Sequence, residues 1–420
     1  MMQKPLPRLR SDLDVMPSPS PEHPGLLLRD VYRYTEAMLV IPPALVPALA
    51  YFDGEKTQPD LQSFLTQRVG QAVASDVIEY LVETLRGEGF LETEEYFRMR
   101  ERRQEEFRGL PERPAAHAGS AYPAQPEALR EEFAGYFRSA PALPDPPGVI
   151  GIAAPHVSPM GGWRSYASAY AQLPPAPDGA APHEMTYVLL GTSHYGQPEK
   201  FGLTRKPFAT PLGSLPVDTA LVDWIEKRSG DAVLMEDYCH SIEHSIEFQC
   251  VFLQHVLGAN PRVLPILCGS FLESLLTGKA PESNDGVMRF FDTLGELAER
   301  EGSRLFWILG VDLAHIGRRY GDGFAARAEA GRMTGIRERD LERLGHYCRG
   351  DANAFFDLVK PDHDRLRWCG YSALYTFLKA VPAARGDLLH YEQWNIDEQS
   401  VVSFAALQFT RGVASQPRPR

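Results

Sequence analysis

Short hydrophobic runs alternate with amphipathic segments from about residue 117 to residue 410. The runs have the length and composition of buried strands, and they lie at 148–154, 185–191, 263–269, 304–311, 387–392 and 403–409. Apolar residues at helical spacing predict helices between them, at 126–138, 218–228, 243–257, 286–300, 323–348 and 370–380. This alternation predicts an α/β domain over residues 116–412, with a central mixed or parallel sheet flanked by helices.

The N-terminal third has a different pattern. Residues 1–24 are rich in Pro and Ser, which predicts a disordered tail. Residues 25–95 combine a short strand pattern with a helical one that Gly87 and Gly89 end, which predicts a small winged-helix-like domain. The order of these elements resembles the PqqD-like peptide-recognition domains, and a packing domain specific to this chain is the alternative.

Two further segments complete the organisation. Residues 96–115 carry a charged helical stretch followed by Pro111 and Pro114, which is typical of a linker. Residues 413–420 are polar and contain proline, which predicts a disordered tail.

Charge and cysteine content narrow the function classes. The net charge of -12 argues against nucleic acid as a partner, because phosphate binding needs a basic face. The five cysteines form no CxxC pair, so we expect reduced thiols. No apolar segment is long enough to span a bilayer, and the N-terminus lacks the apolar core of a signal peptide, so we expect a cytoplasmic protein without a membrane partner.

Three of the strand-like runs end on histidine, at His156, His194 and His315, and the last also carries Asp312. Because open α/β sheets gather chemistry beyond the carboxyl ends of their strands, we expect these residues to converge on one rim. Cys369 stands where a loop enters a predicted helix. Two imidazoles and a thiolate would make a transition-metal site, and a carboxylate beside an imidazole can fix its tautomer.

The stretch from His240 to Glu247 allows two interpretations. His240, Glu243 and His244 spell H-x-x-E-H, the inverted zinc-protease pattern, in which the two histidines share a helix face. The other interpretation makes Glu243, His244 and Glu247 polar groups near a cleft at a helix start. There is no G-x-S-x-G, P-loop or G-x-G-x-x-G pattern in a suitable context, which disfavours serine acyl transfer and Rossmann nucleotide binding.

Six motifs in a fixed order resemble the Memo family, whose bacterial members are the B component of the AmmeMemoRadiSam gene cluster. The resemblance covers residues 116–410 and rests on the segments His117–Tyr122, Ala154–His156, Leu190–His194, Glu243–Glu247, Asp312–His315 and Cys369-Gly370.

The resemblance implies a fold similar to that of class III extradiol dioxygenases of the LigB type. It implies His156, His194 and Cys369 as metal ligands and His315 as the acid/base. It further implies a transition metal, iron or copper before zinc, and a metal-dependent oxidoreductase. Pocket or ligand-supporting positions are then expected at Asp312, Glu243, His244, Glu247 and Tyr122.

The expected partners are a small molecule or a peptide, together with radical-SAM and AMMECR-type proteins of the same gene cluster. The alternative is a non-catalytic peptide-binding or scaffold protein that uses the same cleft. Ala121, Ala314 and Ile316 replace aromatic or cysteine residues usual in the family, and an aromatic-rich loop after His156 is missing. The resemblance also implies binding of phosphotyrosine peptides, which has been associated with animal members of the family. These departures weaken that expectation and leave the ligand positions intact.

Overall fold

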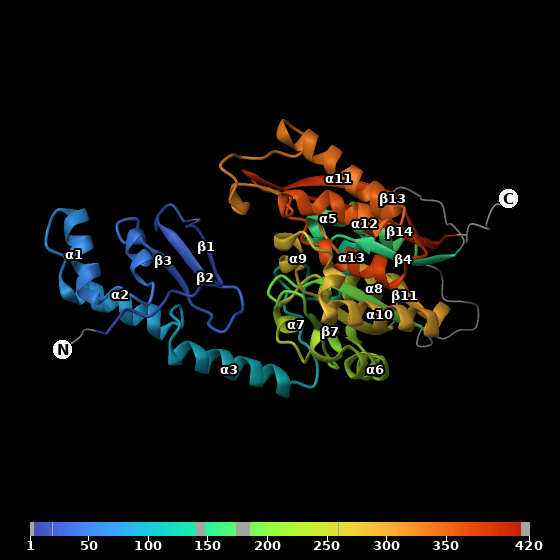
Figure 1. The fold of residues 1–420 in the computed structure, drawn as a ribbon, viewed down its shortest axis with the longest axis horizontal. Coiled ribbons are helices and arrows are strands. Elements are labelled where there is room, and N and C mark those ends of the chain that lie inside the picture. Colours follow the sequence, from blue (N-terminus) through green and yellow to red (C-terminus); the bar gives the residue numbers. More distant parts are fainter. Residues whose placement is uncertain (1–3, 19, 140–147, 174–184, 259, 413–420) are drawn as a thin grey trace. The chain divides into compact units, whose positions relative to one another are not determined.

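A computed structural model describes residues 4–18, 20–139, 148–173, 185–258 and 260–412 (Figure 1). The chain divides into two compact units, Met1–Gly109 and Leu110–Arg420, and each is described by itself. No helix within the described ranges is long and apolar enough to cross a membrane. The predicted tail at 413–420 lies outside the described residues.

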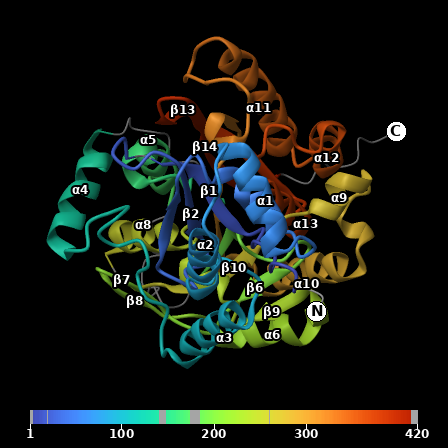
Figure 2. The same ribbon diagram turned by 90° about the vertical axis from the view of Figure 1, so that its left-hand side faces the viewer.

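The first unit combines a small sheet with helices (Figure 2). Its antiparallel strands have the order β1 (Leu13–Pro17), β2 (Leu26–Asp30) and β3 (Met38–Ile41). A 3-10 turn, η1 (Val46–Tyr51), leads to helices α1 (Gln58–Val69), α2 (Ser75–Gly87) and α3 (Glu94–Gly109). The unit has its own buried core, which joins strand residues such as Leu28 to helix residues such as Leu61 and Leu85.

The expectation of disorder over residues 1–24 is wrong for the segment that forms β1, since Leu13–Pro17 pairs along its length with β2. Two contacts ahead of the strand explain the order. Leu6 is buried in the core of the unit, and the Arg10 guanidinium lies 2.9 Å from the Asp30 carboxylate. The Pro- and Ser-rich composition is therefore outweighed by apolar and ionic anchors. Most of the predicted linker at 96–115 is the helix α3.

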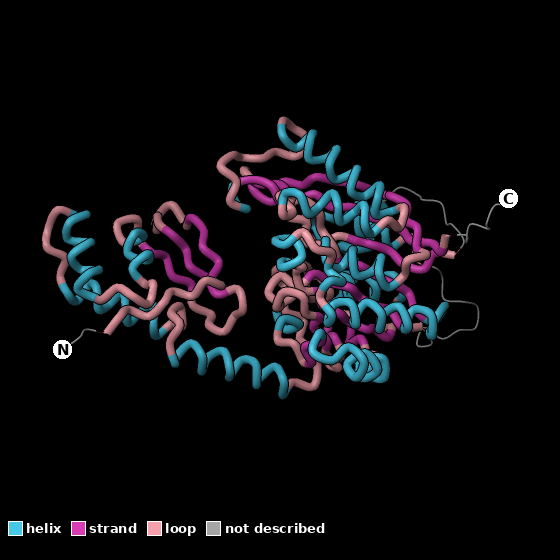
Figure 3. The backbone as a smooth tube through the Cα atoms, viewed as in Figure 1, coloured by secondary structure: helices cyan, strands magenta, loops and turns pink. Residues whose placement is uncertain are grey.

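The second unit is built on a nine-stranded mixed sheet, which confirms the predicted α/β class (Figure 3). Strands β4, β11, β5 and β10 are neighbours and run parallel, and β14 pairs antiparallel with β4. A separate hairpin consists of β7 (Phe208–Thr210) and β8 (Gly213–Leu215). The order across the sheet is β12 (His315–Gly317), β14 (Ser400–Arg411), β4 (Val149–Ala154), β11 (Leu305–Gly310), β5 (Thr186–Thr192), β10 (Arg262–Cys268), β6 (Phe201–Leu203) and β9 (Val233–Met235), with β13 (Ala384–Asp397) paired to β14.

Helices cover both faces of this sheet. In β11, Gly310 faces the segment that leads into α8, whereas Trp307 packs on Phe377 of α13, with ring centroids 5.7 Å apart. Because side chains alternate along a strand, these two contacts lie on opposite faces. The first face carries α4 (Pro126–Ser139), α5 (Pro159–Tyr170) and α8 (Glu247–Leu257), and the second carries α13 (Tyr371–Ala380), α10 (Asp285–Glu301) and α12 (Ala352–Val359). The remaining helices are α6 (Thr219–Ser229), α7 (Cys239–Ile242), α9 (Leu272–Thr277) and α11 (Arg332–Cys348).

Two predicted helices begin later than expected. The pattern at 323–348 becomes helical only at Arg332, because Gly331 has a φ of 56° and cannot continue a right-handed helix. The pattern at 243–257 becomes helical only at Glu247, since Glu243 has extended backbone angles after the short helix α7. Glu243 and His244 therefore lie in a loop.

Candidate metal centre

Three neighbouring parallel strands bring the predicted residues to one rim of the sheet. His156 follows the end of β4, Asp312 follows β11 and His194 follows β5, and β11 lies between the other two strands. Since the carboxyl ends of parallel strands share one edge, the three side chains meet there.

The loop between α7 and α8 reaches the same rim because two strands have a glycine at or next to their carboxyl ends, Gly310 as the last residue of β11 and Gly191 as the second-last of β5. A Cβ on Gly310 would lie 2.2 Å from the carbonyl oxygen of Ser245, and one on Gly191 would lie 2.6 Å from a carbon of Ile246. The Ser245 hydroxyl also donates a hydrogen bond of 2.8 Å to the carbonyl of Thr192. This close approach places the loop residues Glu243 and His244 beside the strand ends.

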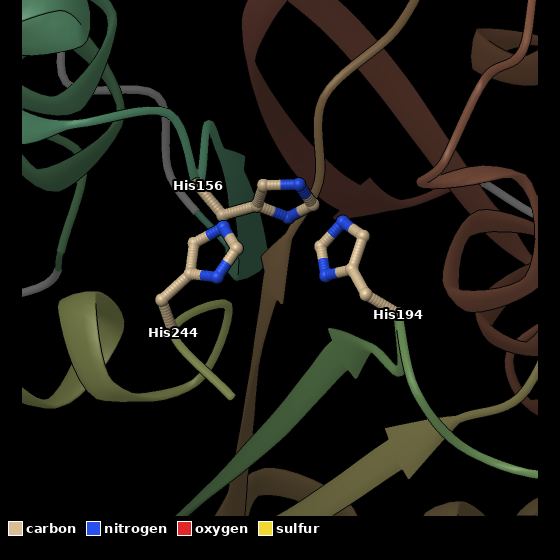
Figure 4. Close-up of side chains that lie close together, drawn as sticks. All are labelled: His156, His194 and His244. Carbon is tan, nitrogen blue, oxygen red and sulfur yellow. The ribbon is translucent and has the colours of Figure 1, made fainter. Parts of the chain in front are cut away.

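Three histidines converge at this point. His156, His194 and His244 each offer one ligand atom, and these atoms all lie within 4.8 Å of one another. Figure 4 shows the three rings pointing toward one another from separate segments. The side chain of His156 is 2% exposed, whereas those of His194 and His244 are 25% and 27% exposed. The cluster is therefore closed on one side and open to solvent on the other.

Hydrogen bonds fix the ring orientations. Nδ1 of His156 donates to the carbonyl of Gly310 at 3.0 Å, because a carbonyl can only accept. Nδ1 of His194 lies 3.0 Å from Glu243 Oε1, and Nδ1 of His244 lies 3.2 Å from the same oxygen. With each Nδ1 occupied in this way, Nε2 is the nitrogen available to a metal ion.

The Glu243 carboxylate organises this half of the site. It is 1% exposed and also accepts the backbone N–H groups of His194, His244 and Ser245. Burial alone would raise the pKa of Glu243, but the charges of His194 and His244 and the hydrogen bonds from their side chains hold that pKa well below its ordinary value. Glu243 therefore carries a negative charge beside two imidazoles.

Cys369 approaches from the loop ahead of α13, with its Sγ 3.1 Å from Nε2 of His156. Burial opposes ionisation of the thiol, but the charges of His156 and His315 outweigh it and hold the pKa of Cys369 well below its usual range. Burial likewise lowers the pKa of His156, but the charges of Asp312 and Cys369 raise it to about 9. Without a metal ion, these two shifts favour a thiolate beside an imidazolium.

Asp312 and His315 lie next to this pair. Asp312 Oδ1 accepts the backbone N–H of His156 at 2.9 Å, and its carbonyl accepts the N–H of Gly370 at 3.1 Å. Nδ1 of His315 donates to the carbonyls of Leu313 and Arg367, at 2.9 and 3.0 Å. Its Nε2 is therefore the nitrogen left for proton exchange.

Tyr122 and Glu247 do not reach the histidine cluster through any contact that the structure gives them. The Glu247 carboxylate is fully buried and accepts hydrogen bonds from the Tyr122 hydroxyl, the Arg113 guanidinium and the backbone N–H of His117. Arg113 also donates to the carbonyl of Glu243 at 2.8 Å. These residues fasten segment 113–122 to the loop that carries Glu243 and His244.

His240 is turned away from the cluster. Its Nε2 lies 3.0 Å from the carbonyl of Gly202, and its ring packs against Phe208. Since α7 ends at Ile242, His240 and His244 share no helix face, so the inverted zinc-protease geometry is absent from this part of the described chain. The protease pattern predicted His244 as a zinc ligand together with His240, and the other interpretation predicted it as a polar group near a cleft. In the structure His244 lies beside His156 and His194.

The donor set fits a transition metal. Three imidazole nitrogens and a thiolate lie together, with the carboxylates of Glu243 and Asp312 buried around them. Buried anionic groups need a compensating positive charge. Imidazole and thiolate donors favour iron, copper or zinc over magnesium or calcium.

Comparison with known proteins gives the family of the chain. Residues 113–408 match the family described as Memo-like protein. The chain belongs to the Memo-like family. The relatives of this Memo-like protein include a "MEMO1 family protein" of Aquifex aeolicus, which is 25% identical over 87% of this chain and 91% of the relative. Another, from Methanosarcina barkeri, is 27% identical over 70% of this chain and 98% of the relative.

The Aquifex relative aligns over 379 residues, which is longer than the stretch matched by the family. A solved structure of an uncharacterized Escherichia coli protein, JW3007, aligns with 61% of this Memo-like chain and 98% of that chain at a TM-score of 0.39 and 13% identity. That likeness is too distant to add to the fold described above.

Proposed function

We propose that this Memo-like protein binds a transition metal through His156, His194 and Cys369, with His244 as a further donor, and acts as a metal-dependent redox enzyme. The observation that carries the proposal is the Cys369 sulfur, 3.1 Å from the ring of His156 within the histidine cluster. A thiolate held among imidazoles selects a soft or borderline cation. Iron and copper are the expected metals, with zinc as the alternative.

The chain's own residues supply the rest of the site. Glu243 and the Gly310 carbonyl hold the three rings with Nε2 available, which supports ligand geometry and basicity. The side chains of His194 and His244 are partly exposed, so we expect a small molecule to approach the site from their side. A bound iron or copper ion would supply one-electron redox chemistry there.

His315 is the proposed acid/base. Its Nδ1 is committed to two backbone carbonyls, so a proton can be held or released only at Nε2. The ring packs edge-on against Tyr320, with centroids 4.9 Å apart, which limits its rotation. We expect His315→Ala to retain metal and lose turnover.

Elemental analysis tests the metal proposal. Wild-type protein purified without added metal is compared with His156→Ala, His194→Ala and Cys369→Ser. His240→Ala is the matched control, because His240 is a buried histidine of the same domain outside the cluster. We expect loss of metal in the three ligand variants and retention in the control. Full metal occupancy in all three ligand variants would contradict the proposal.

Oxygen consumption with a reductant separates an enzyme from a binding protein. Turnover that depends on metal and on His315 supports the redox enzyme. A metal-loaded protein without turnover would instead favour the alternative, a peptide-binding or scaffold protein that uses the same cleft.

The first unit suggests where a partner would bind. It has a core of its own, which makes it suitable as a recognition module for a peptide or for the radical-SAM and AMMECR-type proteins implied by the family resemblance. Co-purification of these two protein types with the full chain, compared with a chain that starts at Leu110, tests this role. Equal recovery with both chains would contradict it.

A further inference from the structure

We infer that Asp340, on helix α11, is a positioning residue that fixes the position of the loop bearing Cys369 relative to the loop bearing His315. The inference rests on the proposed function, because it assigns Asp340 a role only through those two site residues. Nothing in the sequence pattern of α11 distinguished this aspartate from the other charged residues of the helix.

The first contact reaches the Cys369 loop. Asp340 is fully buried, and its Oδ1 accepts a hydrogen bond of 2.7 Å from Nε1 of Trp368. Trp368 immediately precedes Cys369, and its own side chain is buried. Because the indole N–H can only donate, a change that removes the acceptor leaves it unpaired in the core.

The second contact reaches the His315 loop. Asp340 Oδ2 accepts from the hydroxyl of Ser403 at 2.6 Å, and the Ser403 hydroxyl in turn accepts the backbone N–H of Ala314 at 2.9 Å. Ala314 immediately precedes His315. The same Oδ2 accepts from the hydroxyl of Tyr391 at 2.8 Å. One carboxylate thus joins the residues next to the thiolate and next to the proposed acid/base.

A neighbouring ion pair supports the same loop. Arg343, one helical turn after Asp340, lies 2.7 Å from Oδ1 of Asp364, and both side chains are buried. The other oxygen of Asp364 accepts the backbone N–H of Trp368 at 2.6 Å. Helix α11 therefore holds the ring N–H of Trp368 directly through Asp340, and its backbone N–H indirectly through the Arg343–Asp364 ion pair.

The energetic cost of burying the Asp340 carboxylate indicates that its role is to position the two loops rather than to stabilise the fold. Burying a carboxylate is unfavourable, and hydrogen bonds offset that cost without making the group more stabilising than apolar packing. Three donors from three different segments do fix its orientation. The result is that the positions of Cys369 and His315 relative to each other are fixed, as a metal site with a neighbouring acid/base requires.

Cobalt(II) binding tests the inference on the full chain. The variants are Asp340→Ala, Asp340→Asn and Trp368→Phe, with Asp218→Ala as the matched control. Asp218 is a buried carboxylate that accepts from the hydroxyl of Thr186, at the start of β5 and thus at the opposite end of the strand that leads to His194. The readouts are the cobalt dissociation constant and the thiolate-to-cobalt charge-transfer absorption.

We expect Asp340→Ala to weaken cobalt binding about tenfold or more, as for other groups that orient ligands, and to diminish the thiolate band. Asp340→Asn should restore part of both, because an amide oxygen can still accept from Trp368. Trp368→Phe, which removes one donor and keeps the carboxylate, should change the band in the same direction and serves if Asp340→Ala does not fold. Asp218→Ala should lose stability and keep the wild-type band and affinity.

A second readout does not depend on metal. The N–H of Gly370 donates to the carbonyl of Asp312, so its hydrogen exchange in the metal-free protein reports how firmly the two loops are joined. We expect faster exchange in Asp340→Ala, beyond any loss of global stability, and unchanged relative protection in Asp218→Ala. Wild-type exchange in Asp340→Ala would overturn the inference. If wild-type protein bound no cobalt, the proposed function would fail, while the Gly370 readout would still decide the role of Asp340.

Discussion

The Sγ atom of Cys369 lies 3.1 Å from Nε2 of His156, although the two residues are 213 positions apart in the chain. His156 arrives from the end of a parallel strand, and Cys369 from the loop ahead of α13. The charge of each favours ionisation of the other, which in the metal-free protein favours a proton on the imidazole rather than on the thiol. A metal ion would take the place of that proton.

Replacement of the thiolate should change which metal binds. Cys369→Ser keeps the size of the side chain and removes the soft donor. Affinity for copper(I) and zinc should fall by more than roughly 100-fold, since even outer hydrogen-bond partners contribute 10–100-fold. Competition titrations with a chromophoric chelator measure this. Unchanged copper(I) affinity in Cys369→Ser would remove the thiolate from the ligand set.

The two histidines of the H-x-x-E-H stretch should respond differently. His244→Ala removes a donor of the cluster, and we expect weaker metal binding. His240→Ala removes a ring that faces the Gly202 carbonyl, and we expect wild-type metal content with some loss of stability. Metal content and thermal melting of both variants check this. Loss of metal in both would favour a zinc peptidase instead.

Glu243→Gln should weaken metal binding while the ligands themselves are intact. Nδ1 of His194 and Nδ1 of His244 both point at Oε1 of the carboxylate, and Oε2 accepts the backbone N–H of His194. Glutamine has one accepting oxygen in place of two and no negative charge, so it cannot satisfy all of these donors. We expect affinity to fall about 10–100-fold, the range for partners that orient metal-bound histidines. Isothermal titration with zinc measures it. Glu199→Gln, a buried glutamate outside the cluster, is the control.

The titration of Asp340 should make the stability of the fold depend on pH. Burial raises the pKa of Asp340 to about 6, against the hydrogen bonds from Ser403, Tyr391 and Trp368 and the nearby charge of Arg343. An unfolded aspartate has a pKa near ~3.9. Since the folded state binds this proton more tightly, its contribution to stability is present below about pH 4 and is lost as pH rises through about 6.

Urea unfolding of wild type and Asp340→Asn at several pH values isolates this contribution, because asparagine does not titrate. We expect the free energy of unfolding of the variant to improve relative to wild type as pH rises from about 4 to about 7. A difference between the two proteins that is constant over this range would show that Asp340 keeps an ordinary pKa.

Arg113 lies near the start of the second unit, but we expect it to make a large contribution to the free energy of unfolding. It is fully buried, pairs with Glu247 and donates to the carbonyls of His240 and Glu243. We expect Arg113→Ala to reduce the free energy of unfolding by about 3–5 kcal/mol, because it leaves a buried carboxylate unpaired.

Arg205→Ala is the control for this measurement. Arg205 is 39% exposed in its pairs with Asp223 and Glu226, and exposed pairs contribute about 0–1 kcal/mol. Equal losses in the two variants, measured by urea unfolding, would show that the Glu247 carboxylate finds other partners.

The sequence determined the elements of the second unit and the edge of the sheet on which its chemistry lies. Strand and helix patterns follow from local hydrophobic periodicity, which is why β4, β5 and β11 end close to their predicted positions. The carboxyl-end rule for parallel strands then predicts that His156, His194 and Asp312 converge. The family motifs added Cys369 to this group. Cys369 is far from the strand ends along the chain, so hydrophobic periodicity alone could not predict that it lies beside them.

Only the tertiary structure decided which residues surround that rim. The family motifs predicted His244 only as a pocket or ligand-supporting residue. It lies in the histidine cluster because Gly191 and Gly310 let its loop pack against the strand ends, and hydrophobic periodicity does not predict such an approach. Asp340 looked like one more charge on an amphipathic helix, yet it is fully buried with donors from three segments. Burial and hydrogen bonding between distant segments depend on how elements pack, and a one-dimensional pattern records only which face of an element is apolar.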